Sequence, residues 1–225
     1  MTDWPPLAIL IVTYNRVEIL RETLRRLELH LAYVGRRRVF VADDGSDDGT
    51  QAMVIEEFPD ALLVPSDRKG LGANANAGLR QAWQFSDYVY QSQDDLWLLH
   101  HFDVHPHVEK LMTDETCGYI RLWGAGGHRY TANLEGNHWR VLWNSQELYI
   151  PSDRPHVKHR RFHEHFGMYP EGHTTNATEE AWCWQCKHRA GLDGKQLDVF
   201  VPHAVDIEKN FEHAGWHTRW RDQGL

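Results

Sequence analysis

Residues 7–16 read LAILIVTYNR, an unbroken apolar run that ends in four residues carrying polar groups. Such a run is typical of a parallel strand buried on both faces of a sheet. Directly after it, apolar side chains recur at spacings of three and four residues, which predicts the buried face of a helix. These side chains are Val17, Leu20, Leu24, Leu27 and Leu31.

The alternation of strand and helix continues to about residue 112. Further strands are predicted at residues 39–41, 61–64 and 88–90, and helices at residues 48–58 and 72–83. Strands that alternate with helices indicate βαβ units. We therefore expect an α/β fold in a single domain, with a mostly parallel, Rossmann-like sheet flanked by helices.

Polar residues follow each of the four predicted strands. Because ligands of such sheets bind beyond the carboxyl ends of the strands, we expect these residues to form one site. Paired carboxylates suit Mg²⁺ or Mn²⁺, which takes one or two carboxylates and substrate phosphates. The alternative is that the acidic pairs only cap turns and the following helix. The four groups are Thr13-Tyr14-Asn15, Asp43-Asp44, Asp67-Arg68-Lys69 and Asp94-Asp95.

Four segments occur together in an order and spacing that resemble the N-terminal half of family 2 glycosyltransferases. The resemblance is close over residues 7–100 and looser to about residue 191. It implies a GT-A fold and inverting transfer of a hexosyl or related sugar from a nucleoside-diphosphate sugar with Mn²⁺ or Mg²⁺. The segments are AILIVTYNR (8–16), VADDGSDDGT (41–50), KGLGANANAG (69–78) and QDD (93–95).

The resemblance also implies which residues hold the donor, which we expect to be a UDP-sugar. Thr13 and Asp44 would contact the base, and Lys69 would reach the base or the phosphates. The whole expected donor set is Thr13, Tyr14, Asn15, Asp43, Asp44, Lys69 and Asp94, the last of these beside the ribose.

Asp95 is the metal ligand that the resemblance implies. Gln93 stands where the metal motif of the family often begins with Asp, so the metal would depend mainly on Asp95. Many GT-A enzymes add a C-terminal histidine. His203 is the first candidate, because it follows a predicted strand at residues 197–201, and His213 and His217 are alternatives.

The second half, residues 113–225, is expected to bind the acceptor, and residues 1–112 the nucleotide sugar. Strands are predicted at residues 118–123 and 129–131, and helices at 157–166 and 178–189. Tryptophan and histidine are dense here, which suits a cleft that stacks on rings and binds hydroxyl groups.

Residues 166–172 (FGMYPEG) and 178–183 (TEEAWC) resemble the acceptor segment and acidic pair of the family. In inverting members a carboxylate there removes the proton of the acceptor hydroxyl. Glu180 matches the second acidic position and is the first candidate for this base, with Glu179 in reserve. The alternative is that both are first-turn acids favoured by the helix dipole.

Cys183, Cys186 and His188 have a spacing that suggests zinc. A closed zinc site needs four ligands, and the only other cysteine is the distant Cys117, so a buried cysteine and its neighbour are the preferred interpretation. Three cysteines form no disulfide framework, which favours a reducing cytoplasm. The sequence also lacks a signal-peptide pattern and an apolar run long enough to span a membrane.

The acceptor stays open at this point. A net charge of −8 argues against a general nucleic-acid binder, while the basic residues 158–161 suit either an anionic acceptor or a solvated helix face. A glycan, a small molecule, a protein or a modified nucleobase in DNA are all candidates. Two rival functions are a nucleotidyltransferase, which wants a Gly-rich basic segment after the first strand, and a non-catalytic nucleotide-sugar-binding module.

Overall fold

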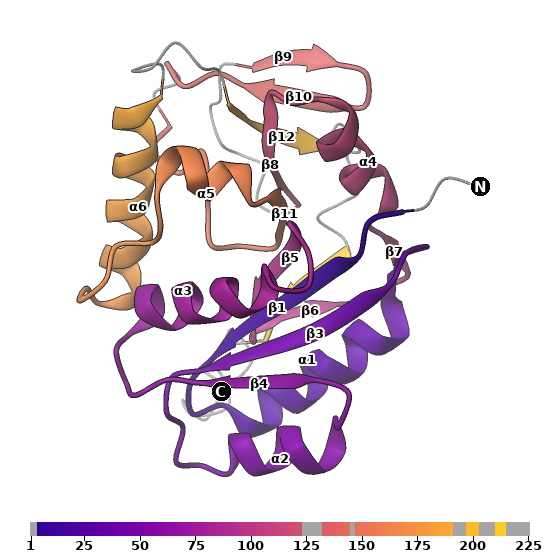
Figure 1. The fold of residues 1–225 in the computed structure, drawn as a ribbon, viewed down its shortest axis with the longest axis vertical. Coiled ribbons are helices and arrows are strands. Elements are labelled where there is room, and N and C mark those ends of the chain that lie inside the picture. Colours follow the sequence, from indigo (N-terminus) through magenta and orange to yellow (C-terminus); the bar gives the residue numbers. More distant parts are fainter. Residues whose placement is uncertain (1–3, 123–131, 145–146, 191–196, 203–209, 215–225) are drawn as a thin grey trace, which may run out of the picture.

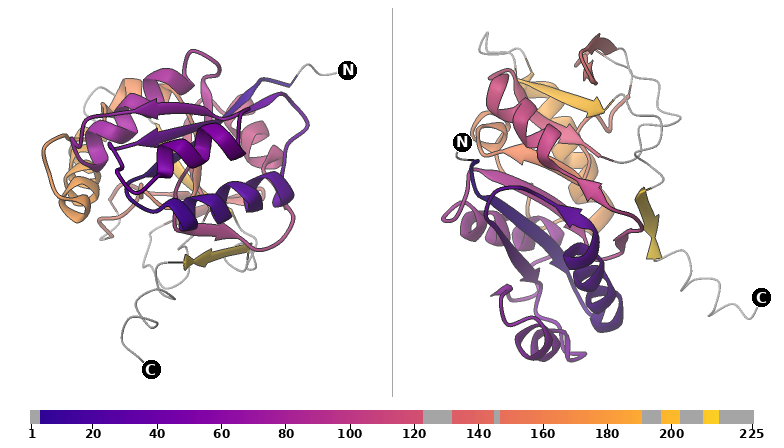
Figure 2. Two further views of the ribbon diagram at one scale, coloured as in Figure 1. Left: turned by 90° about the horizontal axis from the view of Figure 1, so that it is seen from below. Right: turned by 90° about the vertical axis from the view of Figure 1, so that its right-hand side faces the viewer.

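The computed structural model describes residues 4–122, 132–144, 147–190, 197–202 and 210–214. Within these residues nine strands form one central sheet, and helices cover both of its faces (Figures 1 and 2). The strand order across the sheet is β4-β3-β1-β5-β11-β8-β12-β10-β9. The predicted α/β architecture with a large helix-flanked sheet is confirmed.

The first half of the chain supplies four adjacent parallel strands. β1 lies between β3 and β5, and β4 pairs with the far side of β3. A helix connects each of these strands to the next, as the sequence predicts. The elements are β1 (Leu7–Thr13), α1 (Val17–His30), β3 (Arg37–Asp43), α2 (Thr50–Glu57), β4 (Leu62–Pro65), α3 (Leu71–Ala82) and β5 (Tyr88–Gln93).

The parallel arrangement does not extend through the second half. There β12 pairs with β8 in parallel, but the other pairs are antiparallel. One cause is local: a two-residue turn at Gly136, with φ of 58°, joins β9 to β10, and such a turn joins only antiparallel strands. The elements are α4 (His105–Thr113), β8 (Cys117–Arg121), β9 (Ala132–Glu135), β10 (His138–Val141), β11 (His156–His159), α5 (Arg161–Phe166), α6 (Thr175–Arg189) and β12 (Asp198–Pro202).

Two small sheets lie outside the central one, and the sequence did not predict them. β2 (Leu31–Ala32) pairs with β7 (Phe102–Asp103), so the helix α1 ends before Leu31. β6 (Leu96–Leu98) pairs antiparallel with β13 (Phe211–His213). The second pairing brings residues near the C-terminus next to the acidic pair that precedes β6.

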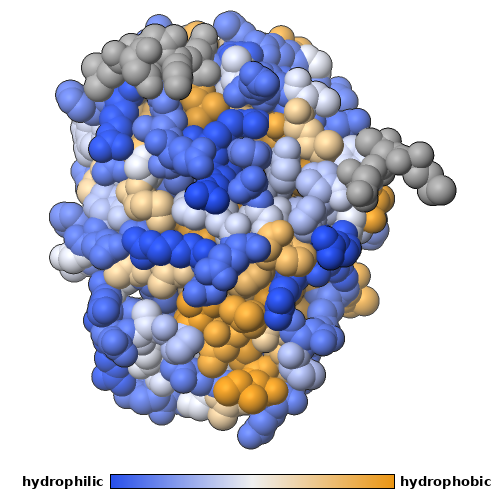
Figure 3. All heavy atoms as spheres, in the orientation of Figure 1, coloured by the Kyte–Doolittle hydropathy of each residue, from blue (hydrophilic) through white to orange (hydrophobic). Residues whose placement is uncertain are grey.

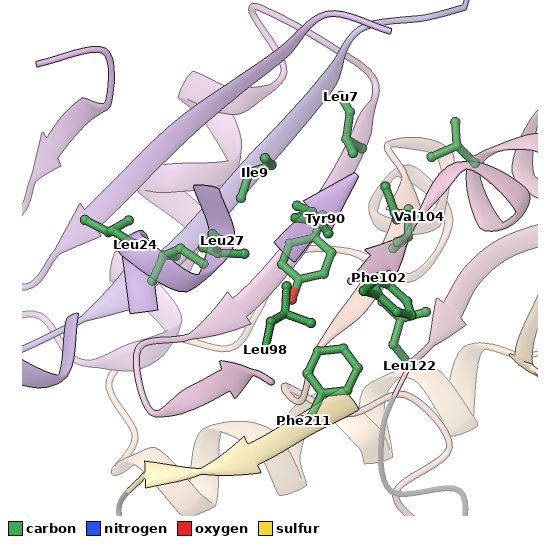
Figure 4. Packing of buried hydrophobic residues seen from close by; sticks show 14 of the residues in the cluster. Leu7, Ile9, Leu24, Leu27, Tyr90, Leu98, Phe102, Val104, Leu122 and Phe211 are labelled. Carbon is green, nitrogen blue, oxygen red and sulfur yellow. The ribbon is translucent and has the colours of Figure 1, made fainter. Parts of the chain in front are cut away.

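Both faces of β1 are buried, which explains its unbroken apolar sequence. Leu7, Ile9 and Ile11 belong to the core cluster beneath α1, α2 and α4, part of which Figure 4 shows. Ala8 and Leu10 belong to a second cluster on the other face, together with residues of α3, α5 and α6. The apolar strand therefore unites two cores.

Gly78 sits where α3 crosses β1 and β3. A Cβ atom at this position would lie 2.6 Å from Leu10 Cδ1 and 2.9 Å from Ala42 Cβ. Alanine favours a helix over glycine by about 1 kcal/mol, but overpacking a core costs about 1–3 kcal/mol. We expect Gly78→Ala to lower the free energy of unfolding by up to about 2 kcal/mol in urea denaturation. Gln81→Ala, on the exposed side of α3, is the control, and a stabilised Gly78→Ala protein would contradict the packing.

The predicted helix at residues 157–166 is wrong in its first part. Residues 156–159 form β11 between β5 and β8, and α5 begins only at Arg161. Lys158 is fully buried: its Nζ donates to Gln91 Oε1 at 2.7 Å and to Tyr169 Oη at 3.2 Å. Burial lowers the pKa of Lys158 well below its usual value.

The basic run 158–161 therefore does not form one solvated helix face, because Lys158 is buried in β11 and only Arg160 is exposed. One partner of Lys158, Gln91, lies 67 residues away in the sequence, and the local pattern does not reveal it. The predicted strand at residues 129–131 lies outside the described residues.

The surface in Figure 3 is mostly hydrophilic, with a hydrophobic area low on this face, around β4 and α2. Ile55 of α2 is 63% exposed. In the part of the chain that the structure describes, no helix has the length and apolarity needed to cross a membrane.

Candidate active site

The register of the parallel strands places their polar ends in one row. Thr13 of β1 is paired with Asp43 of β3, Asp43 with Pro65 of β4, and Val12 with Gln93 of β5. Figure 1 shows β1, β3 and β4 running side by side to this edge. The acidic pairs that follow β3 and β5 thus come to the same rim of the sheet.

A cavity of about 400 Å³ opens at this rim. Its volume lies within the range of small-molecule sites. Both halves of the sequence contribute to its wall: Tyr14 and Asp44 come from the strand ends, and His173 comes from the segment before α6. Thr13, Arg16, Arg68, Gln93 and Asp94 also line it.

Asp44 is fixed by the loop that follows β4. Its Oδ1 accepts hydrogen bonds from the Lys69 amide at 2.8 Å and from Ser66 Oγ at 2.8 Å, and its Oδ2 accepts one from the Gly70 amide at 2.9 Å. Lys69 thus contacts Asp44 through its backbone amide. Of the two neighbouring cations, it is Arg68 that lines the cavity.

Asp43 and Asn15 form hydrogen bonds with the turn that follows β3, and neither lines the cavity. Asp43 Oδ2 accepts from the Ser46 amide at 3.0 Å and from Gln51 Nε2 at 2.6 Å. The Asn15 amide donates to Ser46 Oγ at 2.8 Å, and its Oδ1 accepts from the Asp47 amide at 2.9 Å. Asp43 therefore shapes the turn, whereas Asp44 lines the cavity.

Asp94 is buried among groups that hold its carboxylate. Thr13 Oγ1 donates to its Oδ2 at 2.6 Å, and Arg16 Nη1 lies 3.0 Å from its Oδ1. Burial raises the pKa of Asp94 to about 6, against the opposing effects of Arg16 and Thr13. The Thr13 hydroxyl thus donates its hydrogen bond to Asp94, whereas the resemblance implied that Thr13 contacts the nucleobase.

Asp95 has the features that a metal ligand needs. It is 4% exposed, and within the described chain no hydrogen-bond donor reaches its buried Oδ1. Its Oδ2 lies 2.7 Å from Arg16 Nη1 and 3.7 Å from His213 Nε2. An unpartnered buried oxygen costs free energy, so Oδ1 fits an oxygen-seeking divalent cation that supplies the missing contact.

The pairing of β13 with β6 explains the position of His213. The Ala214 amide donates to the Asp95 carbonyl at 2.8 Å, which fixes the end of β13 beside the acidic pair. His203 and His217 lie outside the described residues. No cluster of three or more His, Cys, Asp or Glu residues able to hold a metal occurs in the described ranges, so substrate oxygens would have to complete the ligand set.

The acidic pair of α6 lies in its second turn, because the helix begins at Thr175. The alternative that both acids are first-turn residues is therefore wrong. Glu179 is half-buried, and its Oε1 accepts from Ser152 Oγ at 2.9 Å and from the Asp153 amide at 3.2 Å. Glu180 is exposed.

Asp153 connects Glu179 to Gln93 of the cavity wall, and it was not among the predicted site residues. The Gln93 side-chain amide donates to the Asp153 carboxyl group. Burial and the neighbouring Glu179 raise the pKa of Asp153 well above its usual value. No motif marks Asp153 in the sequence, and its contacts with Gln93 and Glu179 are visible only in the folded chain.

The cysteines of α6 are buried thiols. Cys183 Sγ donates to the Pro151 carbonyl at 3.1 Å, and burial raises the pKa of both Cys183 and Cys186. These contacts agree with a role in packing.

The sequence matches the family model described as glycosyl transferase family 2 over residues 8–169. The chain belongs to glycosyl transferase family 2. The matched region contains the parallel strands from residue 8 onward and the acidic residues Asp44, Asp94 and Asp95, whereas His173 of the cavity wall lies outside it. No curated protein matches the chain.

Solved structures share the GT-A fold of this family 2 chain. A mannosyltransferase from Pyrobaculum calidifontis, in complex with GDP-Man and Mn²⁺, superposes with a TM-score of 0.62 at 20% identity over 91% of this chain and 56% of that one. TarS residues 1–349 from S. aureus, in complex with UDP-GlcNAc, give 0.58 at 18% identity over 90% and 60%. GalNAc-T7 with UDP, GalNAc and Mn²⁺ gives 0.64 at 11% identity over 90% and 43%.

This family 2 chain spans about half the length of these relatives. At such identities the likeness shows the fold alone. Roles for individual residues of the family 2 chain therefore rest on its own geometry.

Proposed function

We propose that this protein is a metal-dependent, inverting glycosyltransferase that moves a sugar from a nucleoside-diphosphate sugar, in the first place a UDP-sugar, to an acceptor hydroxyl. One observation carries the proposal: Asp44 and Asp94 line the same cavity, and Asp95 lies beside it with an unpartnered buried oxygen. Similar folds bound to GDP-Man, UDP or UDP-GlcNAc support a nucleotide-sugar donor.

The donor would lie along the rim. Asp44, whose carboxylate is held by the Lys69 and Gly70 amides, would accept a hydrogen bond from a base N–H, and Tyr14 lines the same cavity. Asp94 would contact the ribose. Asp95 and His213 would hold Mn²⁺ or Mg²⁺, with the diphosphate oxygens as further ligands. The bound ion supplies positive charge where negative charge develops on the leaving diphosphate.

The acceptor would be activated by the acidic pair of α6. We assign the general base to Glu180, because it is exposed and an acceptor hydroxyl group could therefore reach it. As the acceptor oxygen attacks the anomeric carbon, its proton passes to Glu180 and the bond from that carbon to the diphosphate breaks. Glu179, already engaged by Ser152 and Asp153, is the reserve candidate.

We propose a hydroxyl of a glycan or a small molecule as the acceptor. Two residues of the basic run 158–161 are occupied inside the fold, because Lys158 is buried and Arg161 donates to the Cys117 carbonyl at 2.8 Å. The exposed Arg160 pairs with Glu164 at 3.0 Å, so the run gives little support to an anionic partner. Family membership also removes the reason to prefer a nucleotidyltransferase. All three cysteines are free thiols, in keeping with the reducing cytoplasm that the sequence predicts.

A donor screen tests the proposed function. UDP-, GDP- and TDP-sugars are incubated with the protein and Mn²⁺, and the nucleoside diphosphate released by transfer or slow hydrolysis is measured. We expect release with UDP-sugars that stops when EDTA removes the metal. Binding of UDP without release from any donor and acceptor would favour the non-catalytic module, and neither binding nor release would refute the proposed function.

A further inference from the structure

Arg16 occupies an unusual place between the two acids that follow β5. A single nitrogen, Nη1, lies 3.0 Å from Asp94 Oδ1 and 2.7 Å from Asp95 Oδ2. The two carboxylates are 3% and 6% exposed, whereas the Arg16 side chain is 43% exposed. Two adjacent buried carboxylates repel each other, and one cation between them offsets that repulsion.

This position conflicts with a divalent ion on Asp95. The nitrogen of Arg16 already contacts Asp95 Oδ2, and two cations at one carboxylate repel each other. Arg16 also lines the cavity, so its half-exposed guanidinium has open space toward the expected diphosphate. Guanidinium groups bind phosphate oxygens well.

We propose, on the basis of the proposed function, that Arg16 is a positioning residue that alternates between two partners. Without metal, Arg16 bridges the carboxylates of Asp94 and Asp95 and keeps them in the positions that the structure shows. When the ion binds Asp95, the guanidinium leaves the acids and binds the diphosphate. The metal and the diphosphate then favour each other's binding, because each stabilises the arrangement that the other requires.

This exchange gives substitutions at Arg16 opposite effects on two affinities. A variant without the charge loses the competitor for Asp95, so Mn²⁺ alone binds more tightly. The same variant loses a contact to the diphosphate, so UDP binds less tightly in saturating Mn²⁺. A residue that only maintained the fold would weaken both.

The test is calorimetric titration of Mn²⁺ alone, and of UDP in saturating Mn²⁺, with folding checked by circular dichroism. For Arg16→Gln we expect about tenfold tighter Mn²⁺ binding and about tenfold weaker UDP binding. Changes of this size correspond to a moderate shift of the equilibrium away from the state in which residue 16 bridges the two acids. Arg16→Lys should stay close to the wild type, because one cationic nitrogen makes both contacts. Arg68→Gln is the matched control: this arginine also lines the cavity but pairs with Asp47, so its loss should leave the affinity for Mn²⁺ alone unchanged.

If the folded Arg16→Gln protein binds Mn²⁺ with unchanged or weaker affinity, the proposed exchange of partners by Arg16 is wrong. If the wild type nevertheless binds UDP, the proposed function is unaffected. If the wild type binds UDP neither with nor without Mn²⁺, the proposed function fails as well. Should Arg16→Gln not fold, Arg16→Met is measured in the same way, and the sign of its change in Mn²⁺ affinity decides.

Discussion

Asp95→Asn is expected to reduce metal-dependent sugar transfer by about 10³-fold or more at saturating donor and Mn²⁺. The substitution keeps the size of the side chain and removes the charge. A divalent ion stabilises the charge on a leaving diphosphate by several kcal/mol, and each 1.36 kcal/mol lost from the barrier corresponds to about tenfold in rate. Asp95 is the acid whose buried Oδ1 has no donor within the described chain, so its loss should remove the ion from the site.

The measurement is the initial rate of nucleoside-diphosphate release over a range of Mn²⁺ concentrations. Asp60→Asn is a suitable control, because Asp60 is exposed and lies in the turn before β4. Transfer by Asp95→Asn at the wild-type rate and with the wild-type metal dependence would refute the metal assignment.

Glu180→Gln is expected to slow transfer by about 10²-fold or more while donor binding is retained. Glutamine preserves the shape of the side chain but takes up no proton. Glu180 is exposed, so this change should leave the packing of α6 intact. The rate is measured under single-turnover conditions, and UDP affinity is measured separately, so that the loss is assigned to the chemical step.

Glu179→Gln is the matched comparison, since it makes the same chemical change one residue away. Its carboxylate accepts hydrogen bonds from Ser152 and the Asp153 amide, so we expect a smaller effect from altered positioning. A large rate loss in Glu179→Gln together with a near-normal Glu180→Gln protein would move the base to Glu179. Normal rates in both would remove the acidic pair from the chemistry.

The parallel half of the fold was predictable because its signals are local. β1 is apolar at every core position, since both of its faces are buried, and the spacing of Leu20, Leu24 and Leu27 marks one face of α1. β11 was missed for the opposite reason. Its polar residues are buried through partners such as Gln91 and Tyr169, which the sequence near Lys158 does not reveal.

The same distinction applies to the candidate site. Residues that follow strands, such as Asp44 and Asp94, were found because parallel strands end at one rim. The choice of histidine was not predictable: His213 reaches Asp95 only through the pairing of β13 with β6, more than a hundred residues apart in the chain. Arg16 belongs to the first motif of the sequence. Its contacts with Asp94 and Asp95 were not predictable, because these acids follow β5, almost eighty residues later in the chain.

Crystallographic analysis of the protein with UDP and Mn²⁺, using anomalous diffraction to locate manganese, tests the shared diphosphate site most directly. We predict one manganese peak beside Asp95, in contact with the diphosphate, and the uracil ring in the cavity next to Asp44. UDP bound elsewhere, or manganese bound away from Asp95 while UDP fills the cavity, would contradict it.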